Sequence, residues 1–464
     1  MNVRARGRCH ARVAIDLAAV AALCAWVALA AASHRFARVP IALYLVVMSV
    51  AWTSTLTSLR LARDVSPSAL VFRVWFWAVV FRVVGMVAQP VLEDDYFRYL
   101  WDGWVFSQTG NPYLTIPADH FLDPSVPDAL LPVLSGINYP DVPTIYGPVA
   151  QWGFRLSHFV APGQLWPWKL LLVGAELVTL RLLLRVVSPA RAVLFAWCPL
   201  LIQETAFSAH PEALGVLAMV AATMWSQRGD HIGAAIGFAL AAGVKPIGAL
   251  LAPLALCRRP LTTWAAFGAA TVAVWGPFLL DGTFGEWTGL VVFARQWEYN
   301  SSLFGVFAAL TGQHIGRTLS LLLMAAGYVA LMQATRRQEP GRNGLLGLIR
   351  GDWAYGGLLL LSPVVNPWYL AWLVPFVVCH PSRVGIASMA AVSLSYLHGL
   401  NIGNVSLGLY AHPAWLRPLE YGIIAVAALS SLGSVLPTRR WRRRVPRRVL
   451  YASDSTRGTA SLNS

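Results

Sequence analysis

Three adjacent carboxylates, Glu93, Asp94 and Asp95, directly follow an apolar stretch of the chain. Neighbouring carboxylates make it costly to ionise all of them together, which raises the pKa of at least one. A carboxylate with a raised pKa is a candidate general base near neutral pH. The alternative interpretation is a solvated helix start, because acidic residues favour the first turn of a helix. The spacing alone leaves both interpretations open.

A helix that begins at Asp95 would bring further polar groups to one face. Offsets of three, four and seven residues place Arg98, Tyr99 and Asp102 on the face that carries Asp95. We therefore predict that this helix directs one cation and several acids at the same volume. Turn-forming motifs follow at 110–113 (GNPY) and 138–148 (NYPDVPTIYGP), and by composition they indicate an ordered loop.

Polar residues also stand out at three later places. His210 and Glu212, in the motif SAHPE at 208–212, either bind sugar hydroxyls or a phosphate together or form a polar helix cap. Lys245 and Asn366 interrupt apolar segments, and an ionisable residue at membrane depth is a functional candidate. Lys245 suits a phosphate because its ammonium is a compact point charge.

The sequence contains no zinc motif, glycine-rich phosphate loop or nucleotide fingerprint, and its five cysteines form no CxxC pair. We expect no resident metal or cofactor. Dependence on a divalent cation stays open, because clustered acids can bind one. An enzyme with this sequence would need a donor that is already present at the membrane.

The elements that must position these residues are membrane helices. Hydrophobic residues make up 57% of the 464 residues and charged residues only 12%, against about 25% charged in soluble domains. The net charge of +15 comes from arginine clusters between apolar runs, which indicates positive-inside topology rather than a nucleic-acid patch. We expect membrane lipid as a partner and no nucleic acid.

The apolar runs predict the topology of the chain. Spans fall at about 13–33, 40–60, 69–89, 167–186, 191–207, 212–227, 262–280, 316–334, 384–399 and 418–436. Residues 90–166, with eight acidic and two basic side chains, then form a long outer loop, and residues 281–302 form a second. The prediction is one all-α polytopic domain at 1–436 in the plasma (inner) membrane, with both termini cytoplasmic. Residues 437–464 are predicted to be a basic, then disordered, cytoplasmic tail.

Two apolar segments are interrupted in the middle, at GVKP (243–246) within 230–259 and at SPVVNPWY (362–369) within 352–383. Each half rises only about 18 Å, which is too short for a hydrocarbon core of about 30 Å. We predict two short hairpins with Lys245 and Asn366 at their tips, facing one cavity beside the long loop. Their limbs bring the total to about 12 to 14 membrane segments. Transporters show a similar signature, so a transporter or lipid flippase is the alternative function.

Six motifs follow one another along the chain: DDYFRYLWDG (94–103), GNPY (110–113), YGPVAQ (146–151), AHPEAL (209–214), VKP (244–246) and NPWYL (366–370). Together they resemble the bacterial polyprenol-phosphate-mannose-dependent mannosyltransferases. These belong to the C-type membrane glycosyltransferase superfamily, as do the glycosylphosphatidylinositol mannosyltransferases. The resemblance covers about residues 90 to 380. The sequence departs from the family at Gly147, where a second proline is expected, and at Asn366, where a small residue or histidine is commoner.

The resemblance implies the C-type glycosyltransferase architecture and an inverting transfer from a polyprenyl phosphate donor, with mannose as the expected sugar. A hydroxyl of a glycolipid or polysaccharide acceptor would attack the anomeric carbon, and the lipid phosphate would leave. Asp94 or Asp95 would be the base, and Arg98, Lys245 and His210 would serve the phosphate, with the active site facing outside. Further substrate contacts are expected from Tyr99, Asp102, Tyr146, Glu212, Asn366, Trp368 and Tyr369. The short hairpins would wall the prenyl groove.

Overall fold

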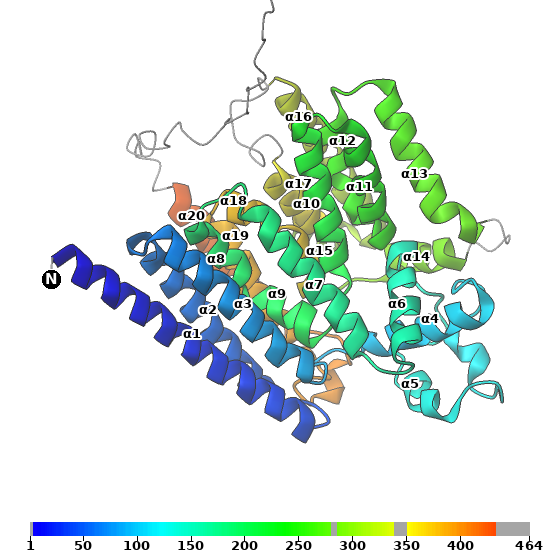
Figure 1. The fold of residues 1–464 in the computed structure, drawn as a ribbon. Helices are drawn as coiled ribbons and strands as arrows, with labels where there is room; N and C mark the ends of the chain where they lie inside the picture. The colour runs from blue at the N-terminus through cyan, green and yellow to red at the C-terminus, as the bar shows by residue number, and fades with distance from the viewer. Residues whose placement is uncertain (1–2, 280–284, 338–349, 433–464) are drawn as a thin grey trace, which may run out of the picture.

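The computed structural model describes residues 3–279, 285–337 and 350–432 (Figure 1). Within these ranges the chain forms helices, turns and loops, with one isolated β-bridge and no named strand. The prediction of an all-α protein is therefore confirmed. The predicted tail at 437–464 and the start of the predicted second loop, 281–284, lie outside the described residues.

Four described helices are long and apolar enough to cross a membrane: Cys9–Arg35, Ile41–Asp64, Pro67–Val87 and Gln313–Arg337. They correspond to α1 (Val3–Arg35), α2 (Ile41–Leu61) with the turn η1 (Ala62–Asp64), α3 (Pro67–Val87) and α16 (Gln313–Arg337). Only 11% of the most apolar stretch of α16 is buried within the protein, so its natural solvent is lipid. A total of 12 to 14 membrane segments is not confirmed by these lengths.

Shorter helices occupy the other predicted spans. They are α7 (Trp166–Leu183), α8 (Pro189–Ala196), α9 (Pro199–Leu201), α10 (Glu212–Arg228), α13 (Leu261–Leu279), α19 (Arg383–Ala391) and α20 (Leu416–Leu432). Two of these spans are irregular. The span at 191–207 breaks at Cys198, because Pro199 lacks an N–H and disfavours helical geometry in the residue before it. It continues as the π-helical turn η4 (Ile202–Phe207), while α19 passes into the 3-10 turn η7 (Val392–Tyr396).

Both interrupted segments turn back where the sequence predicts. The first hairpin consists of α11 (His231–Val244), η5 (Pro246–Leu251) and α12 (Ala252–Leu256), and the second of α17 (Gly351–Leu361), η6 (Pro367–Trp372) and α18 (Val374–Cys379). At the base of the first hairpin Arg259 lies beside His231, with Nη1 3.4 Å from Nε2. The 14 residues of α11 rise about 21 Å, so neither limb crosses a bilayer alone.

The long loop is folded rather than extended. It contains α4 (Asp95–Thr109), η2 (Pro117–His120), η3 (Asp128–Leu130), α5 (Leu131–Ser135) and α6 (Pro148–Val160). Figure 1 shows α4, α5 and α6 gathered at one end of the molecule, next to α7 and α14 (Gly285–Gln296). Helix α15 (Leu303–Thr311) packs against α16, and η8 (Val405–Leu407) lies in the loop before α20. The loop therefore forms a cap whose position depends on the helices beneath it.

A buried ion pair fixes the helix that leads into this cap. Arg82 on α3 donates from Nε to Oε2 of Glu176 on α7 at 2.7 Å, and the two side chains are 1% and 2% exposed. The guanidinium also donates to the carbonyl of Ala196 at 2.8 Å, and Thr205 donates to the other carboxylate oxygen at 2.9 Å. Buried charges persist only when they are paired and hydrogen-bonded. The pair therefore holds α3 against α7 and α8.

Candidate active site

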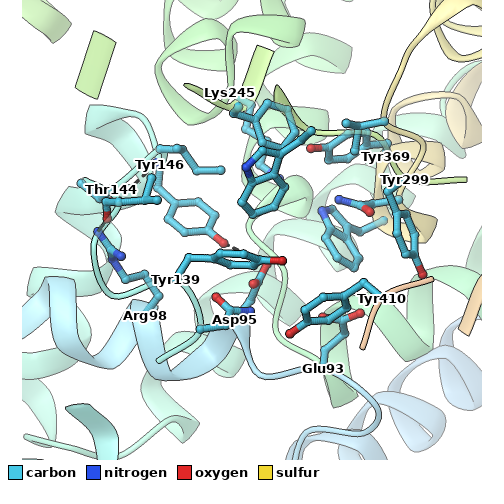
Figure 2. Close-up of a pocket in the computed structure, with 18 of the residues that line it drawn as sticks. Glu93, Asp95, Arg98, Tyr139, Thr144, Tyr146, Lys245, Tyr299, Tyr369 and Tyr410 are labelled. Carbon is cyan, nitrogen blue, oxygen red and sulfur yellow. Dashed lines mark hydrogen bonds between the residues drawn. The ribbon is translucent and has the colours of Figure 1, made fainter. Parts of the chain in front are cut away.

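One cavity of about 330 Å³ lies between the long loop and the two hairpin tips (Figure 2). Its walls come from segments that are far apart in the sequence. The lining residues come from two parts of the long loop (within 93–98 and within 138–146), from the tip of the first hairpin at Lys245, from the segment 293–299, from the tip of the second hairpin (within 364–369) and from the loop that carries Tyr410. The prediction that the two hairpin tips face one cavity beside the loop agrees with this geometry.

The three carboxylates form the turn between α3 and α4. Leu92 has a φ of +67° and reverses the chain, and α4 begins at Asp95 as predicted. Asn138 Nδ2 donates to Asp94 Oδ1 at 2.6 Å, and Tyr146 donates from its hydroxyl to Asp95 Oδ2 at 2.9 Å. Asp95 lines the cavity, whereas Asp94 is not among the lining residues. The two candidate bases are thus placed differently.

The environment of the acidic turn favours protonation. Burial raises the pKa of Asp95, and the Tyr146 hydrogen bond and the Lys245 charge oppose this effect. Burial, reinforced by the Asp95 charge, raises the pKa of Asp94 to about 6. Burial and the charges of both aspartates raise the pKa of Glu93 well above its usual range. Carboxylate oxygens of all three lie within 4.8 Å of one another, a spacing at which one divalent cation can be held.

The shared face of α4 does not present all its polar groups to the cavity. Arg98 lines it, donates from Nε to Asp102 Oδ1 at 2.9 Å and from Nη2 to the carbonyl of Val142 at 3.0 Å. Asp102 is 2% exposed and also accepts hydrogen bonds from Thr144 and Gln151, at 2.5 and 2.9 Å. Asp102 therefore holds the loop and Arg98 in place from behind the cavity wall.

Aromatic packing supports the same wall. Tyr99 is buried and stacks on Phe154, with ring centroids 4.9 Å apart, and it meets Tyr146 edge-on at 5.0 Å. Tyr146 lines the cavity and Tyr99 does not. The structure thus brings Asp95, Arg98 and Tyr146 to the cavity and keeps Tyr99 and Asp102 behind them.

The long loop touches the first hairpin at a pair of glycines. The N–H of Gly147 donates to the carbonyl of Val244 at 3.2 Å, and a Cβ at Gly147 would lie 2.3 Å from the carbonyl oxygen of Gly243. Proline at 147 would lose this hydrogen bond and collide with Gly243. The contact explains why this sequence has glycine where the resemblance suggests proline.

The close approach of the glycines places Lys245 in the cavity. Lys245 adopts an extended backbone after α11, as expected for a residue before proline. Its ammonium pairs with the buried carboxylate of Glu212 at the start of α10. It also lies 5.0 Å from the ring centroid of Tyr369 and 5.8 Å from that of Tyr146. Glu212 thus orients a cation that faces the cavity, without lining the cavity itself.

His210 lies directly behind the cavity wall. Its ring stacks on Trp368, a lining residue, with centroids 3.9 Å apart and planes at 14°. Nδ1 lies 3.1 Å from Glu204 Oε2, and Nε2 lies 3.9 Å from Asp95 Oδ2. The preceding Ala209 has a φ of +65°, and its carbonyl accepts a hydrogen bond from Trp168 at 2.8 Å. His210 thus lies between Asp95 and Glu204, a buried acid on the π-helical turn.

The tip of the second hairpin is joined to the segment before α15. Tyr299 donates its N–H to the carbonyl of Pro363 at 3.0 Å and accepts from the N–H of Val365 at 2.8 Å. This places Asn366, Trp368 and Tyr369 on the cavity wall, and a position facing the cavity is what the sequence predicts for Asn366.

Sequence reasoning missed Glu204. This residue is 1% exposed and accepts hydrogen bonds from the Tyr396 hydroxyl at 3.0 Å on both carboxylate oxygens. The sequence did offer a signal for Glu204, because it is a carboxylate inside the apolar run 191–207, and an ionisable residue within a membrane span is a functional candidate by default. Sequence reasoning also passed over Tyr410, for which the sequence offers no signal because only the fold brings its loop to the cavity.

Comparison with known proteins gives one match. Residues 145–363, just under half of the chain, match the model of glycosyltransferase family 87. Comparisons with curated proteins and with solved structures gave no match. The matched range includes Tyr146, His210, Glu212 and Lys245 but excludes the acidic turn at 93–95. Together with helices able to cross a membrane, the match supports a membrane glycosyltransferase and does not favour a transporter.

Proposed function

We propose that this protein is an inverting glycosyltransferase of the plasma (inner) membrane. It moves a sugar, with mannose the expected one, from a polyprenyl phosphate to a hydroxyl of a glycolipid or polysaccharide on the outer face. The observation that carries the proposal is one cavity in which a partly buried carboxylate, Asp95, and a cation, Lys245, are both available to a substrate.

In this mechanism Asp95 removes the proton of the acceptor hydroxyl. The hydroxyl oxygen forms a bond to the anomeric carbon from the face opposite the leaving group. The bond between that carbon and the phosphate oxygen breaks, and the polyprenyl phosphate leaves with the bonding electrons. Lys245 and Arg98 offset the charge on the phosphate.

Two features support Asp95 over Asp94 as the base. Asp95 lines the cavity, and Asp94 does not. Tyr146 orients the Asp95 carboxylate through a 2.9 Å hydrogen bond, while Asn138 already engages Asp94. Burial raises the pKa of both aspartates, which brings their proton affinity closer to what a base needs near neutral pH but does not distinguish one from the other.

The first hairpin offers an apolar wall to the prenyl chain. Ile232, Ile236 and Leu240 are exposed on α11, and their spacing of four residues places them on one face of the helix. This face belongs to the hairpin whose tip carries Lys245. A lipid chain along it would lead to a phosphate at the cavity.

Sugar transfer from a labelled polyprenyl phosphate donor tests the proposal. Asp95→Asn is expected to lower kcat by about 10²- to 10⁴-fold, the usual contribution of a general base. Asp94→Asn should lower it far less. Asp128→Asn is the matched control, because Asp128 is exposed in the same loop and lies outside the cavity. Wild-type activity in Asp95→Asn would exclude this base, and ligand uptake by proteoliposomes without sugar transfer would favour a transporter.

A further inference from the structure

Three aromatic side chains form a platform on one side of the cavity. Tyr139, Trp297 and Tyr410 all line it. The ring centroids of Tyr139 and Trp297 are 4.6 Å apart, and those of Tyr139 and Tyr410 are 6.1 Å apart. The three come from separate parts of the chain, so the grouping is a product of the fold. We call Tyr139, Trp297 and Tyr410 the aromatic platform.

The backbone at Tyr139 is held in an unusual conformation. Its φ is +49°, in the left-handed region that costs a residue with a side chain about 1–2 kcal/mol. Tyr139 precedes Pro140, and residues before proline favour extended geometry. Its side chain is nevertheless 42% exposed, so core packing does not account for the ring position. Strained residues of this kind cluster at ligand sites.

Polar side chains line the cavity together with the aromatic platform. Asn138, Gln296 and Glu298 line the same cavity. A pyranose ring has apolar C–H faces and a polar rim of hydroxyl groups. An aromatic side chain can pack against the C–H face of the sugar, and amide and carboxylate side chains can form hydrogen bonds with its hydroxyl groups. This combination suits a saccharide better than a peptide side chain or a lipid tail.

Tyr139 and Tyr410 of the aromatic platform lie apart from Lys245, the proposed phosphate cation (Figure 2). Figure 2 shows Tyr139 and Tyr410 beside Asp95 and Glu93, with Lys245 across the cavity from Glu93. Burial raises the pKa of Tyr139, and the nearby charges of Asp94 and Asp95 raise it further, which agrees with this proximity. A donor phosphate at Lys245 therefore leaves the platform to the acceptor.

We infer that Tyr139, Trp297 and Tyr410 form the acceptor subsite and bind a saccharide ring, so that the acceptor is a sugar-bearing molecule. This inference rests on the proposed function, since it assigns one side of the same cavity. It predicts that the hydroxyl to be glycosylated is presented to Asp95 by stacking of the sugar ring next to it.

Binding and transfer are measured separately with the purified full-length protein. The probe acceptor is an octyl glycoside of a mannose disaccharide, and its Kd is determined by titration calorimetry without donor. Alanine variants of each platform residue should raise Kd and the KM for this acceptor by about 3- to 10-fold, from the value of one aromatic contact. The KM for the donor should stay within twofold. Tyr139→Phe should raise the acceptor KM less than Tyr139→Ala, because the ring is kept.

Trp415→Ala is the matched control, since Trp415 is 55% exposed and does not line the cavity. Unchanged acceptor Kd in all three platform variants would overturn the inference, as would an increase confined to the KM for the donor. Wild-type transfer to a serine-rich peptide and not to the disaccharide would also overturn it. Disaccharide binding that depends on the platform, without any sugar transfer by the wild type, would support the subsite and count against the proposed function alone.

Discussion

The contact between Gly147 and Gly243 gives a sharp prediction for Gly147→Ala. The added Cβ would lie 2.3 Å from the carbonyl oxygen of Gly243 and 3.1 Å from that of Val244. Carbon–oxygen contacts are normally at least about 3.3 Å long, so the backbones must separate by about 1 Å. Both oxygens belong to the backbone just before Lys245, so no flexible side chain can move aside to relieve the contact.

The consequence is expected in both stability and activity. Overpacking of this kind lowers the free energy of unfolding by about 1–3 kcal/mol. A displacement of about 1 Å at a substrate-positioning group can lower the rate by about 10²-fold. We therefore expect Gly147→Ala to lower kcat/KM for sugar transfer by about 10- to 100-fold. Gly147→Pro should be more harmful, because it also removes the N–H that donates to Val244.

Thermal unfolding in detergent and initial transfer rates with saturating acceptor measure the two effects. Gly174→Ala is the matched control, since a Cβ there meets nothing within 4 Å and alanine favours a helix. It should unfold at the wild-type temperature or above. Wild-type stability and wild-type kcat/KM in Gly147→Ala would refute the argument from close approach.

Three other predictions follow from charges in and beneath the site. In the proposed mechanism Asp95 removes a proton as a carboxylate, so transfer should fall as the pH drops through the raised pKa of Asp95. Lys245→Met removes a charge that lowers this pKa, and should move the midpoint of the pH–kcat profile to higher pH; an unchanged midpoint would contradict the coupling. Chelation by EDTA should leave transfer intact, because two of the three adjacent carboxylates already accept hydrogen bonds from protein side chains; loss that magnesium or manganese restores would show a metal requirement. Arg82→Met leaves Glu176 buried without its charged partner and should lower stability by about 3–5 kcal/mol, seen as a lower unfolding temperature; a wild-type unfolding temperature would contradict this.

Much of the fold follows from local patterns. Apolar runs locate α1, α2, α3 and α16, and the interruptions at Lys245 and Asn366 correctly indicate turns. The π-helical turn η4 could not be predicted, because its hydrogen-bonding pattern depends on tertiary contacts of residues such as Glu204 and Thr205. The sequence pattern alone also cannot determine how many segments cross the bilayer, because short helices such as α8 and α9 depend on their neighbours for burial.

The sequence points to several residues that line the cavity, among them Asp95 and Lys245, but not to Tyr410 or to the way the lining residues are arranged. The spacing of α4 correctly placed Asp95 and Arg98 on one face, but it could not tell that Thr144 and Gln151 would cover Asp102. Likewise, the motif around His210 gave no sign that Trp368 would cover its ring. Such details depend on which side chains the fold brings together from distant segments, and a single sequence does not record that.

The ion pair between Arg82 and Glu176 also has a consequence for biosynthesis. The two residues are 94 positions apart in the chain, so α3 is made and inserted well before α7 exists. Until then Arg82 has no carboxylate partner on α7, and an arginine in a membrane helix costs about 2.5–3.5 kcal/mol at insertion. Helix α3 can bear this cost, because its most apolar stretch has a mean hydropathy of 1.9 and its other arginine, Arg73, is already paired with Asp16 on α1. The long loop is synthesised during this interval. Its acidic turn follows α3 directly, so the turn is held in position only after Glu176 on α7 pairs with Arg82.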